Sequence, residues 1–266
     1  MVADDGVDDL IDLLGRRAEL LAHLRDTPSD KRELVADLDV PRSTLDRALR
    51  ELETADLVCY EDGVYRLTAM GRRLTAEFMQ FRERLERAVE LEPALRWTTP
   101  EQFDLDLRWL ADAEMWTPDP NDPWTMINRY VSALEAADRI CGAVPLVNLR
   151  AVETVHERAV VGGATVDIVL DSGVVDRLRT DENYVSLFRD LRSRDSVSLS
   201  VFQEGPVPYL ISLFDDSIVQ IGVGKKYEPR ALVESDDENV VAWARETLDA
   251  YRRASVPIEE HDDADD

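Results

Sequence analysis

The sequence predicts an α+β protein with two domains joined by a long helix, and three observations carry this prediction. Residues 29–71 read as two short helices followed by an Asp-Gly hairpin. Residues 69–91 continue as one uninterrupted helical pattern, and residues 140–223 alternate strand-like and helix-like runs before an antiparallel pair. The expected divisions are a first domain at 1–68, a linking helix at 69–98, a second domain at 99–256 and a disordered acidic tail at 257–266.

The second helix within residues 29–71 has one apolar side and one basic side. Its apolar residues recur at i, i+3, i+4 and i+7 and therefore form one buried stripe, consisting of Leu45, Ala48, Leu49 and Leu52. The positions left outside this stripe are Arg42, Ser43, Thr44, Arg47 and Arg50. In a helix-turn-helix, such positions meet phosphates and base edges in the major groove.

The flanking residues have the types that begin and end such elements. Asp30 and Glu33 form a capping-box pattern, Pro41 suits the first turn of the second helix, and residues 62–63 (Asp-Gly) predict a hairpin. In residues 41–45, 49–52 and 65–71 the sequence resembles the winged-helix regulators of archaea and bacteria. The resemblance implies double-stranded DNA as partner, with the second helix as reader and the hairpin as wing.

Each polar residue of this segment receives an expected role. Thr44 and Arg47 are expected to contact bases, and the hairpin residues Tyr65 and Arg66 are expected to contact DNA as the wing. The expected phosphate contacts are Lys31, Arg32, Arg42, Ser43 and Arg50. The alternatives are that the winged helix binds a protein partner, that Tyr65 packs in the core, and that Arg66 pairs with Glu61 or Asp62.

The charge balance is unusual for a DNA-binding protein. The formal net charge is −25, and only three of the basic residues are lysines. An acid excess with scarce lysine is typical of proteins from a salt-saturated cytoplasm, so we expect a haloarchaeal source, where the Debye length is about 3 Å. Residues 40–73 nevertheless hold six arginines against six acids. In the rest of the chain we interpret the excess of acidic residues as a solvated protein surface that indicates no particular partner.

The linking helix carries a near-heptad apolar stripe made of Met70, Leu74, Phe78, Phe81 and Leu85. Charged residues flank the stripe, so we expect a homodimer that sets the spacing of two recognition helices. The alternative is packing against the second domain of the same chain.

The second domain resembles a known effector domain through residues 122–124 (Asp-Pro-Trp), 204–209 (Glu-Gly-Pro-Val-Pro-Tyr) and 232–235 (Leu-Val-Glu-Ser). It is similar to the effector domain of archaeal regulators of the methanogenesis-regulator type, and more distantly to that of the sugar-sensing TrmB family. The resemblance implies a mixed α/β sheet with a phospholipase-D-like fold that lacks the catalytic chemistry.

No catalytic motif is present in the sequence. Phospholipase-D-type catalysis needs a His-x-Lys motif, and none of His23, His156 and His261 has a lysine two residues on. We therefore predict no enzyme activity, no metal and no cofactor. Cys59 and Cys141 are expected to be reduced thiols. The acidic N-terminus and the absence of a long apolar run favour a cytoplasmic protein that does not enter a membrane.

Ligands of α/β sheets bind near the carboxyl ends of strands, which points to a set of polar residues as candidate contacts for a small-molecule effector. They are Pro145, Asn148, Asp171, Ser172, Gln203, Glu204, Tyr209 and Lys225. Asp171 and Ser172 have the alternative role of capping the next helix, and Lys225 with Lys226 can bind an anion or pair with Glu228. The sequence thus predicts a dimeric, sequence-specific transcriptional regulator with a sensor domain; the alternative is a protein-interaction module without specific DNA binding.

Overall fold

The structure, a computed structural model, describes residues 4–99, 103–225 and 228–259. The chain divides into two compact units, residues 1–86 and residues 87–266. This boundary differs from the predicted linking helix at 69–98, because residues 69–86 group with the first unit.

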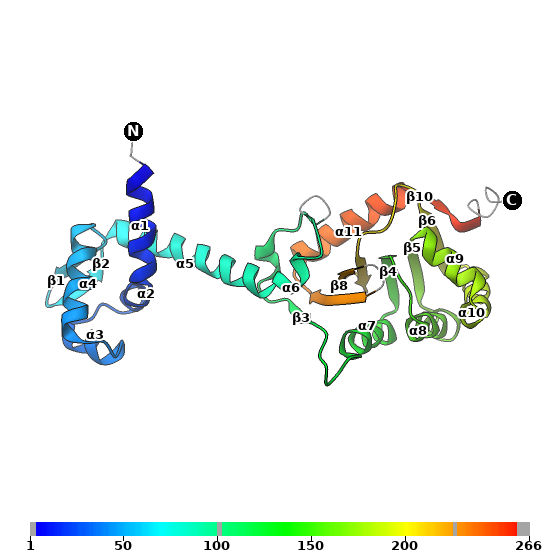
Figure 1. The fold of residues 1–266 in the computed structure, drawn as a ribbon, viewed down its shortest axis with the longest axis horizontal. Coiled ribbons are helices and arrows are strands. Elements are labelled where there is room, and N and C mark those ends of the chain that lie inside the picture. Colours follow the sequence, from blue (N-terminus) through cyan, green and yellow to red (C-terminus); the bar gives the residue numbers. More distant parts are fainter. Residues whose placement is uncertain (1–3, 100–102, 226–227, 260–266) are drawn as a thin grey trace. The chain divides into compact units, whose positions relative to one another are not determined.

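The first unit consists of helices and one hairpin (Figure 1). In chain order its elements are α1 (Asp4–Arg16), α2 (Ala18–Asp26), α3 (Lys31–Asp37), α4 (Arg42–Thr54), β1 (Val58–Glu61), β2 (Val64–Leu67) and α5 (Ala69–Glu90), of which the last extends beyond residue 86. The sequence predicts a single helix over 8–25, but Arg17 interrupts it with φ −114° and ψ 15°. This break lets the Arg17 side chain turn to Glu51 on α4.

The core of the first unit confirms the predicted apolar stripe of α4. Leu45, Ala48, Leu49 and Leu52 are all buried. They pack with leucines of α2 and α3, and with Tyr65 and Leu67 of the hairpin. Burial of each leucine contributes about 1.5–3 kcal/mol, so this stripe holds α4 against the rest of the unit.

The predicted start of α3 and the predicted hairpin turn are also confirmed. The Asp30 carboxylate accepts hydrogen bonds from two backbone amides of α3, and the Glu33 carboxylate accepts one from the Asp30 amide. Asp62 and Gly63 both have positive φ, 52° and 86°. An antiparallel bridge joins Ser29 to Tyr65, which fixes the hairpin to the start of α3.

The second unit is a mixed sheet with helices on both faces (Figure 1). Its elements are α6 (Glu92–Leu95), the 3-10 helix η1 (Leu107–Leu110), β3 (Glu114–Trp116), α7 (Thr125–Ala136), β4 (Arg139–Val144), α8 (Leu149–Val160), β5 (Thr165–Leu170), α9 (Ser172–Thr180), α10 (Glu182–Arg192), β6 (Val197–Phe202), β7 (Leu210–Phe214), β8 (Ile218–Lys225), β9 (Glu228–Ser235), α11 (Glu238–Arg253) and β10 (Ser255–Pro257).

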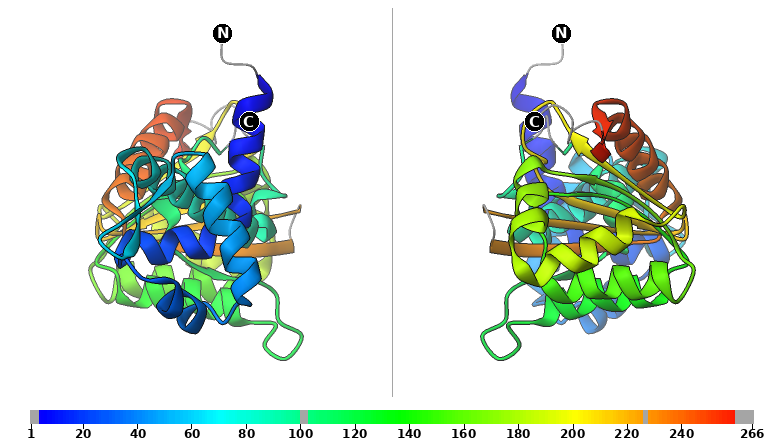
Figure 2. Two further views of the ribbon diagram at one scale, coloured as in Figure 1. Left: turned by 90° about the vertical axis from the view of Figure 1, so that its left-hand side faces the viewer. Right: turned by 90° about the vertical axis from the view of Figure 1, so that its right-hand side faces the viewer.

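The sheet has eight described strands in the order β10-β6-β5-β4-β7-β8-β9-β3. Strands β6, β5 and β4 run parallel, and every other pairing is antiparallel. In Figure 2, right, the green and yellow-green helices α8 to α10 lie on one face and the orange-red α11 lies on the other. The predicted mixed α/β sheet covered by helices is therefore confirmed.

Three short or irregular strands escape the sequence analysis. β3 and β10 have three residues each, too few for an alternating pattern, and β9 carries a bulge opposite Val223 and Gly224. β10 also corrects the predicted tail: it pairs with β6, and Ile258 after it is 1% exposed. Residues 257–259 thus belong to the fold, and residues 260–266 of the predicted tail lie outside the described residues.

Within the described parts of the chain, no helix combines the length and the apolar character needed to cross a membrane. In the same residues, histidine, cysteine and carboxylate side chains form no cluster of three arranged to hold a metal ion.

Candidate nucleic-acid interface and ligand cavity

The side of α4 that faces away from the core carries all five predicted contact residues of that helix. Each of them is exposed: Arg42, Ser43, Thr44, Arg47 and Arg50. Most of the Arg47 side chain (79%) is accessible to solvent. The first turn of α4 presents its hydroxyls and Arg42 together, because Pro41 begins the helix with φ −57°.

A carboxylate on α4 holds two arginines in place. The Glu51 carboxylate accepts a hydrogen bond from Arg17 at 2.7 Å on one oxygen and from Arg47 Nε at 3.0 Å on the other. These two guanidinium groups hold the pKa of Glu51 below its usual value. The ion pair restrains the Arg47 side chain on the open side of the helix, which lowers the entropy cost of ordering it against a ligand.

We expect this carboxylate to make the stability of the protein pH-dependent. A carboxyl whose pKa is depressed in the folded state stabilises the fold fully above its unfolded pKa, about 4.3. That stabilisation is lost as the pH falls through the depressed folded pKa. Between about pH 5 and pH 3, Glu51→Gln is therefore expected to show a shallower loss of thermal stability than the parent protein. Unfolding midpoints in molar KCl measure this difference.

Glu53 provides the control, because it is exposed and lies two residues from Glu51. The Glu53→Gln variant is expected to follow the parent protein across the same pH range. If Glu51→Gln and Glu53→Gln had the same profile, the two arginines would not stabilise the Glu51 carboxylate.

Lys31 has a partner inside the protein. Its ammonium group donates a hydrogen bond to Asp46 at 2.7 Å and lies 5.7 Å from the centre of the Tyr65 ring. The hydrogen bond to Asp46 raises the pKa of Lys31. Lys31 therefore ties α3 to α4, and a phosphate would have to compete with Asp46 for it. Arg32, the other predicted phosphate contact on α3, is exposed.

The hairpin differs from the prediction. Tyr65 is 7% exposed and packs in the core, so its assignment as a wing contact was wrong. Tyr60 is the exposed aromatic residue of the hairpin, at 56%, and its ring lies 4.8 Å from that of Tyr65. Arg66 lies 3.9 Å from Glu61 and 3.8 Å from Asp62, which is the pairing that the sequence left as the alternative.

Acidic residues of α1 lie close to the basic side of α4, a feature that the sequence does not predict. Asp9 and Asp12 line the same surface hollow as Arg47 and Arg50. The two carboxylates are three residues apart, which places them on one side of α1. That spacing is visible in the sequence, but the packing of α1 against α4 is not.

The residues of the predicted dimer stripe on α5 lie in two different environments in the structure. Leu74 and Phe78 are partly buried and pack against the core of the first unit. Neither the predicted dimer interface nor the alternative contact with the second domain implies that these two residues pack on the first unit. Phe81 and Leu85 are exposed at 46% and 51%, and Val89, one helical turn further, is exposed at 74%. Met70, at the start of the helix, is 53% exposed.

The predicted ligand residues do not come together. Asp171 caps α9 through the Gly173 amide and accepts a second hydrogen bond from the Val207 amide at 3.0 Å, as its alternative role predicts. Tyr209 is buried in the core on the α11 face of the sheet, where burial raises the pKa of its hydroxyl. Of the other six, Pro145 is half-buried, four are exposed (Ser172, Gln203, Glu204 and Lys225), and Asn148 lines a cavity. Lys226 lies outside the described residues.

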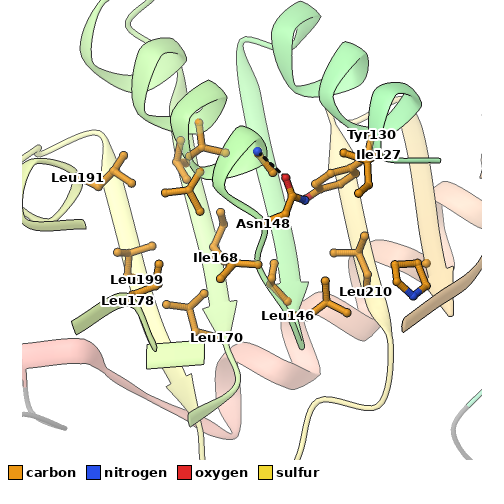
Figure 3. A pocket seen from close by; sticks show the side chains of 18 of the residues that line it. Ile127, Tyr130, Leu146, Asn148, Ile168, Leu170, Leu178, Leu191, Leu199 and Leu210 are labelled. Atoms are coloured by element: carbon orange, nitrogen blue, oxygen red, sulfur yellow. Dashed lines mark hydrogen bonds between the residues drawn. The ribbon is translucent and has the colours of Figure 1, made fainter. Parts of the chain in front are cut away.

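That cavity lies on the other face of the sheet, under α7, α8 and α10, and measures about 120 Å³ (Figure 3). Side chains of β4 to β7 and of β9 form its floor, including Ile168, Leu199 and Leu210. The lining is apolar throughout except for Tyr130 and Asn148. The sequence does not predict the cavity, because its lining residues have the same apolar character as any sheet core.

Comparisons with known proteins identify two families that match separate segments of the chain. Residues 4–90 match the family described as the HVO_A0261 N-terminal domain, and residues 123–254 match the family described as methanogenesis regulatory protein FilR1, middle domain. The fold and these two tandem matches define an archaeal regulatory protein. More particularly, residues 123–254 form a domain of the FilR1 type, which confirms the resemblance to archaeal regulators seen in the sequence. No curated protein matches the sequence.

Three solved structures are similar to the chain at low identity. NucT from Helicobacter pylori is 14% identical, with 55% of this chain and 98% of that chain covered and a TM-score of 0.45. TrmBL2, described as an archaeal chromatin protein with a novel mode of DNA binding, is 18% identical, with coverages of 94% and 99% and a TM-score of 0.40. The phospholipase D family member Nuc from Salmonella typhimurium is 13% identical, with coverages of 55% and 97% and a TM-score of 0.42. At these scores the phospholipase-D-like fold stays a prediction.

Proposed function

We propose that this protein is a sequence-specific, DNA-binding transcriptional regulator in which α3, α4 and the β1–β2 hairpin act as a winged helix-turn-helix. One observation carries the proposal. The apolar side of α4 is buried, and its opposite side presents Arg42, Arg47 and Arg50 to solvent together with two hydroxyl side chains. A helix with a sealed apolar side and a free basic side fits the major groove, which is about 12 Å wide.

In this proposal, Thr44 and Arg47 read base edges, whereas Ser43, Arg42 and Arg50 contact phosphates. Arg32 on α3 adds a phosphate contact, and Tyr60 takes the place of Tyr65 on the wing. An arginine at the position of Arg47 is suited to reading a base, because its planar guanidinium can donate two hydrogen bonds to guanine O6 and N7. The FilR1-type second unit supports a regulatory role for the whole chain.

A second function is favoured by one observation. Asp9 and Asp12 share a surface hollow with Arg47 and Arg50, and a mixed-charge hollow suits a protein surface better than a uniformly negative DNA backbone. The alternative is therefore a module whose α4 binds a protein partner.

Sequencing the DNA fragments that the tagged full-length chain protects in molar KCl tests the two functions. The proposal expects a set of fragments that share one sequence element. Fragments without a common element, together with a protein that co-purifies in a fixed ratio, would favour the interaction module.

We also propose that the protein acts as a homodimer in the cytoplasm and that its second unit senses a signal. Phe81, Leu85 and Val89 would meet their counterparts on a second α5 helix. A signal bound to the second unit could then change the separation of two DNA-binding units, provided that it binds the two states with different affinity. Catalysis has no part in this proposal, since His156 hydrogen-bonds Asp190 and no lysine follows it at the spacing that phospholipase-D chemistry needs.

The acidic side chains of α1 give a test of where DNA binds. Replacing both carboxylates (Asp9→Asn with Asp12→Asn) is expected to raise affinity for DNA about three- to tenfold, since each exposed charge contributes about 0.2–1 kcal/mol. The increase should shrink as KCl rises, because salt screens exposed charges. Titration of a fluorescent duplex at several KCl concentrations measures both effects.

The control variant, Asp176→Asn with Glu182→Gln, removes the same charge from exposed positions of the second unit. It is expected to leave the affinity unchanged. Equal gains in the two variants would mean that only net charge matters and that DNA does not approach α4 beside α1.

A further inference from the structure

The cavity of the second unit combines an apolar lining with polar groups concentrated at one place. Its 23 lining residues come from α7, α8, α9, α10 and six strands of the sheet, and from the loop after β4. None of them carries a charge, and only Tyr130 and Asn148 have polar side chains. Figure 3 shows Asn148 and Tyr130 among the leucine and isoleucine side chains that line the cavity.

Asn148 is held with its amide nitrogen free for a ligand. Its Oδ1 caps α8 by accepting a hydrogen bond from the Ala151 amide at 3.0 Å, which fixes the orientation of the side chain. The Nδ2 group of the same side chain donates no hydrogen bond to any described residue, although the residue lines the cavity. Tyr130, by contrast, has a partner, since its hydroxyl lies 3.3 Å from the Ser212 hydroxyl.

We propose that this cavity binds a small, uncharged and largely apolar molecule with one hydrogen-bond acceptor, which Asn148 Nδ2 contacts. This inference rests on the sensor role proposed above for the second unit and specifies its ligand class. The volume of about 120 Å³ is close to that of a cavity of about 150 Å³ that holds benzene. A charged ligand is excluded because no lining residue could pair with it away from water.

The position of Asn148 also agrees with the general rule for ligands of α/β sheets. The loop that contains Leu146 and Asn148 follows the carboxyl end of β4, and β5 and β6 run parallel beside it. An apolar pocket with few convergent polar groups at such a place is typical of ligand sites.

Two matched probes test the proposal by calorimetry with the full chain in molar KCl. Acetophenone has the size required and one carbonyl acceptor, whereas ethylbenzene has nearly the same shape and no acceptor. Both probes are expected to bind, with acetophenone about five- to tenfold tighter because of one additional hydrogen bond. Asn148→Ser keeps a side-chain oxygen to cap α8 but removes the amide donor, so it is expected to abolish this difference and leave ethylbenzene binding unchanged.

Variants whose side chains fill the cavity provide a second test of the proposal. Ala151→Leu places extra carbons in the cavity and is expected to remove binding of both probes while the thermal midpoint stays equal or rises. Should that variant fail to fold, Val147→Phe in the loop after β4 serves the same purpose. Leu149→Met is the control, since Leu149 is exposed and does not line the cavity.

Failure of both probes to bind the parent protein would overturn the inference, as would binding that survives Ala151→Leu or a preference for acetophenone that survives Asn148→Ser. These results are independent of the proposed function. Sequence-specific DNA binding without probe binding would overturn only the proposal that the cavity binds a ligand. Probe binding without DNA binding would overturn only the proposed function as a DNA-binding regulator.

Discussion

Replacing Arg47 with alanine is expected to weaken binding to a specific DNA site by about 10- to 100-fold, which corresponds to about 1–3 kcal/mol. Arg47 is the most exposed side chain among the ion pairs of α4, and it lies one helical turn after Thr44 on the open side of the helix. A guanidinium that reads a base contributes to binding of the correct sequence and little to binding of unrelated DNA. The ratio of specific to non-specific affinity should therefore fall by the same factor.

Arg73 on α5 gives a closely matched control. It pairs with Glu77 four residues on at 3.1 Å and is 80% exposed, as Arg47 pairs with Glu51 at 3.0 Å and is 79% exposed. Arg73→Ala thus removes the same charge and the same kind of ion pair, and it is expected to leave the specificity ratio unchanged. Titration of cognate and scrambled duplexes at one KCl concentration gives both ratios. If Arg47→Ala changed neither affinity, α4 would not be the reading helix.

The element that carries the proposed DNA contact was predictable because its pattern is local. Leu45 and Leu52 share one side of α4 through spacing alone, and Pro41 marks the start of the helix. Asp30 and Glu33 cap α3 through contacts between residues three apart. Such features depend on nearest neighbours along the chain, so one sequence suffices to predict them.

The hairpin shows where this kind of prediction fails. Tyr60 and Tyr65 are directly paired across the two strands and therefore point to the same side of the hairpin. Alternation along a strand gives two sides but does not tell how far the core extends beneath one of them. Here the core covers Tyr65 but leaves Tyr60 exposed. This difference depends on the bridge between Ser29 and Tyr65, which local sequence does not reveal.

The cavity could not be predicted for a different reason. Leu199 on β6 and Ile127 on α7 are far apart in sequence, and both have the residue type of an ordinary core position. Whether such residues meet or leave a void depends on how closely the helices approach the sheet. Only Asn148 was predictable, because the rule about carboxyl ends of strands applies to the loop that holds it.

Placing a charge on the exposed stripe of α5 is expected to have the largest effect on assembly. The double variant Phe81→Asp with Leu85→Asp would put four uncompensated carboxylates into the interface of a two-fold dimer. Burial of such charges costs several kcal/mol, so the dimer should dissociate at least about 100-fold more readily, equivalent to about 2.7 kcal/mol. Sedimentation in molar KCl measures the dissociation constant directly.

The core of the first unit should tolerate this change, because Phe81 and Leu85 are exposed whereas Leu74 and Phe78 make the contacts with that core. Val161→Asp with Ile218→Asp adds the same charge at exposed apolar positions of the second unit and is expected to leave the dimer intact. DNA binding gives an independent readout, since a monomer can occupy one half-site but loses the gain from two linked half-sites. A variant that remained dimeric would place the subunit interface elsewhere, and the spacing of half-sites would then not be set by α5.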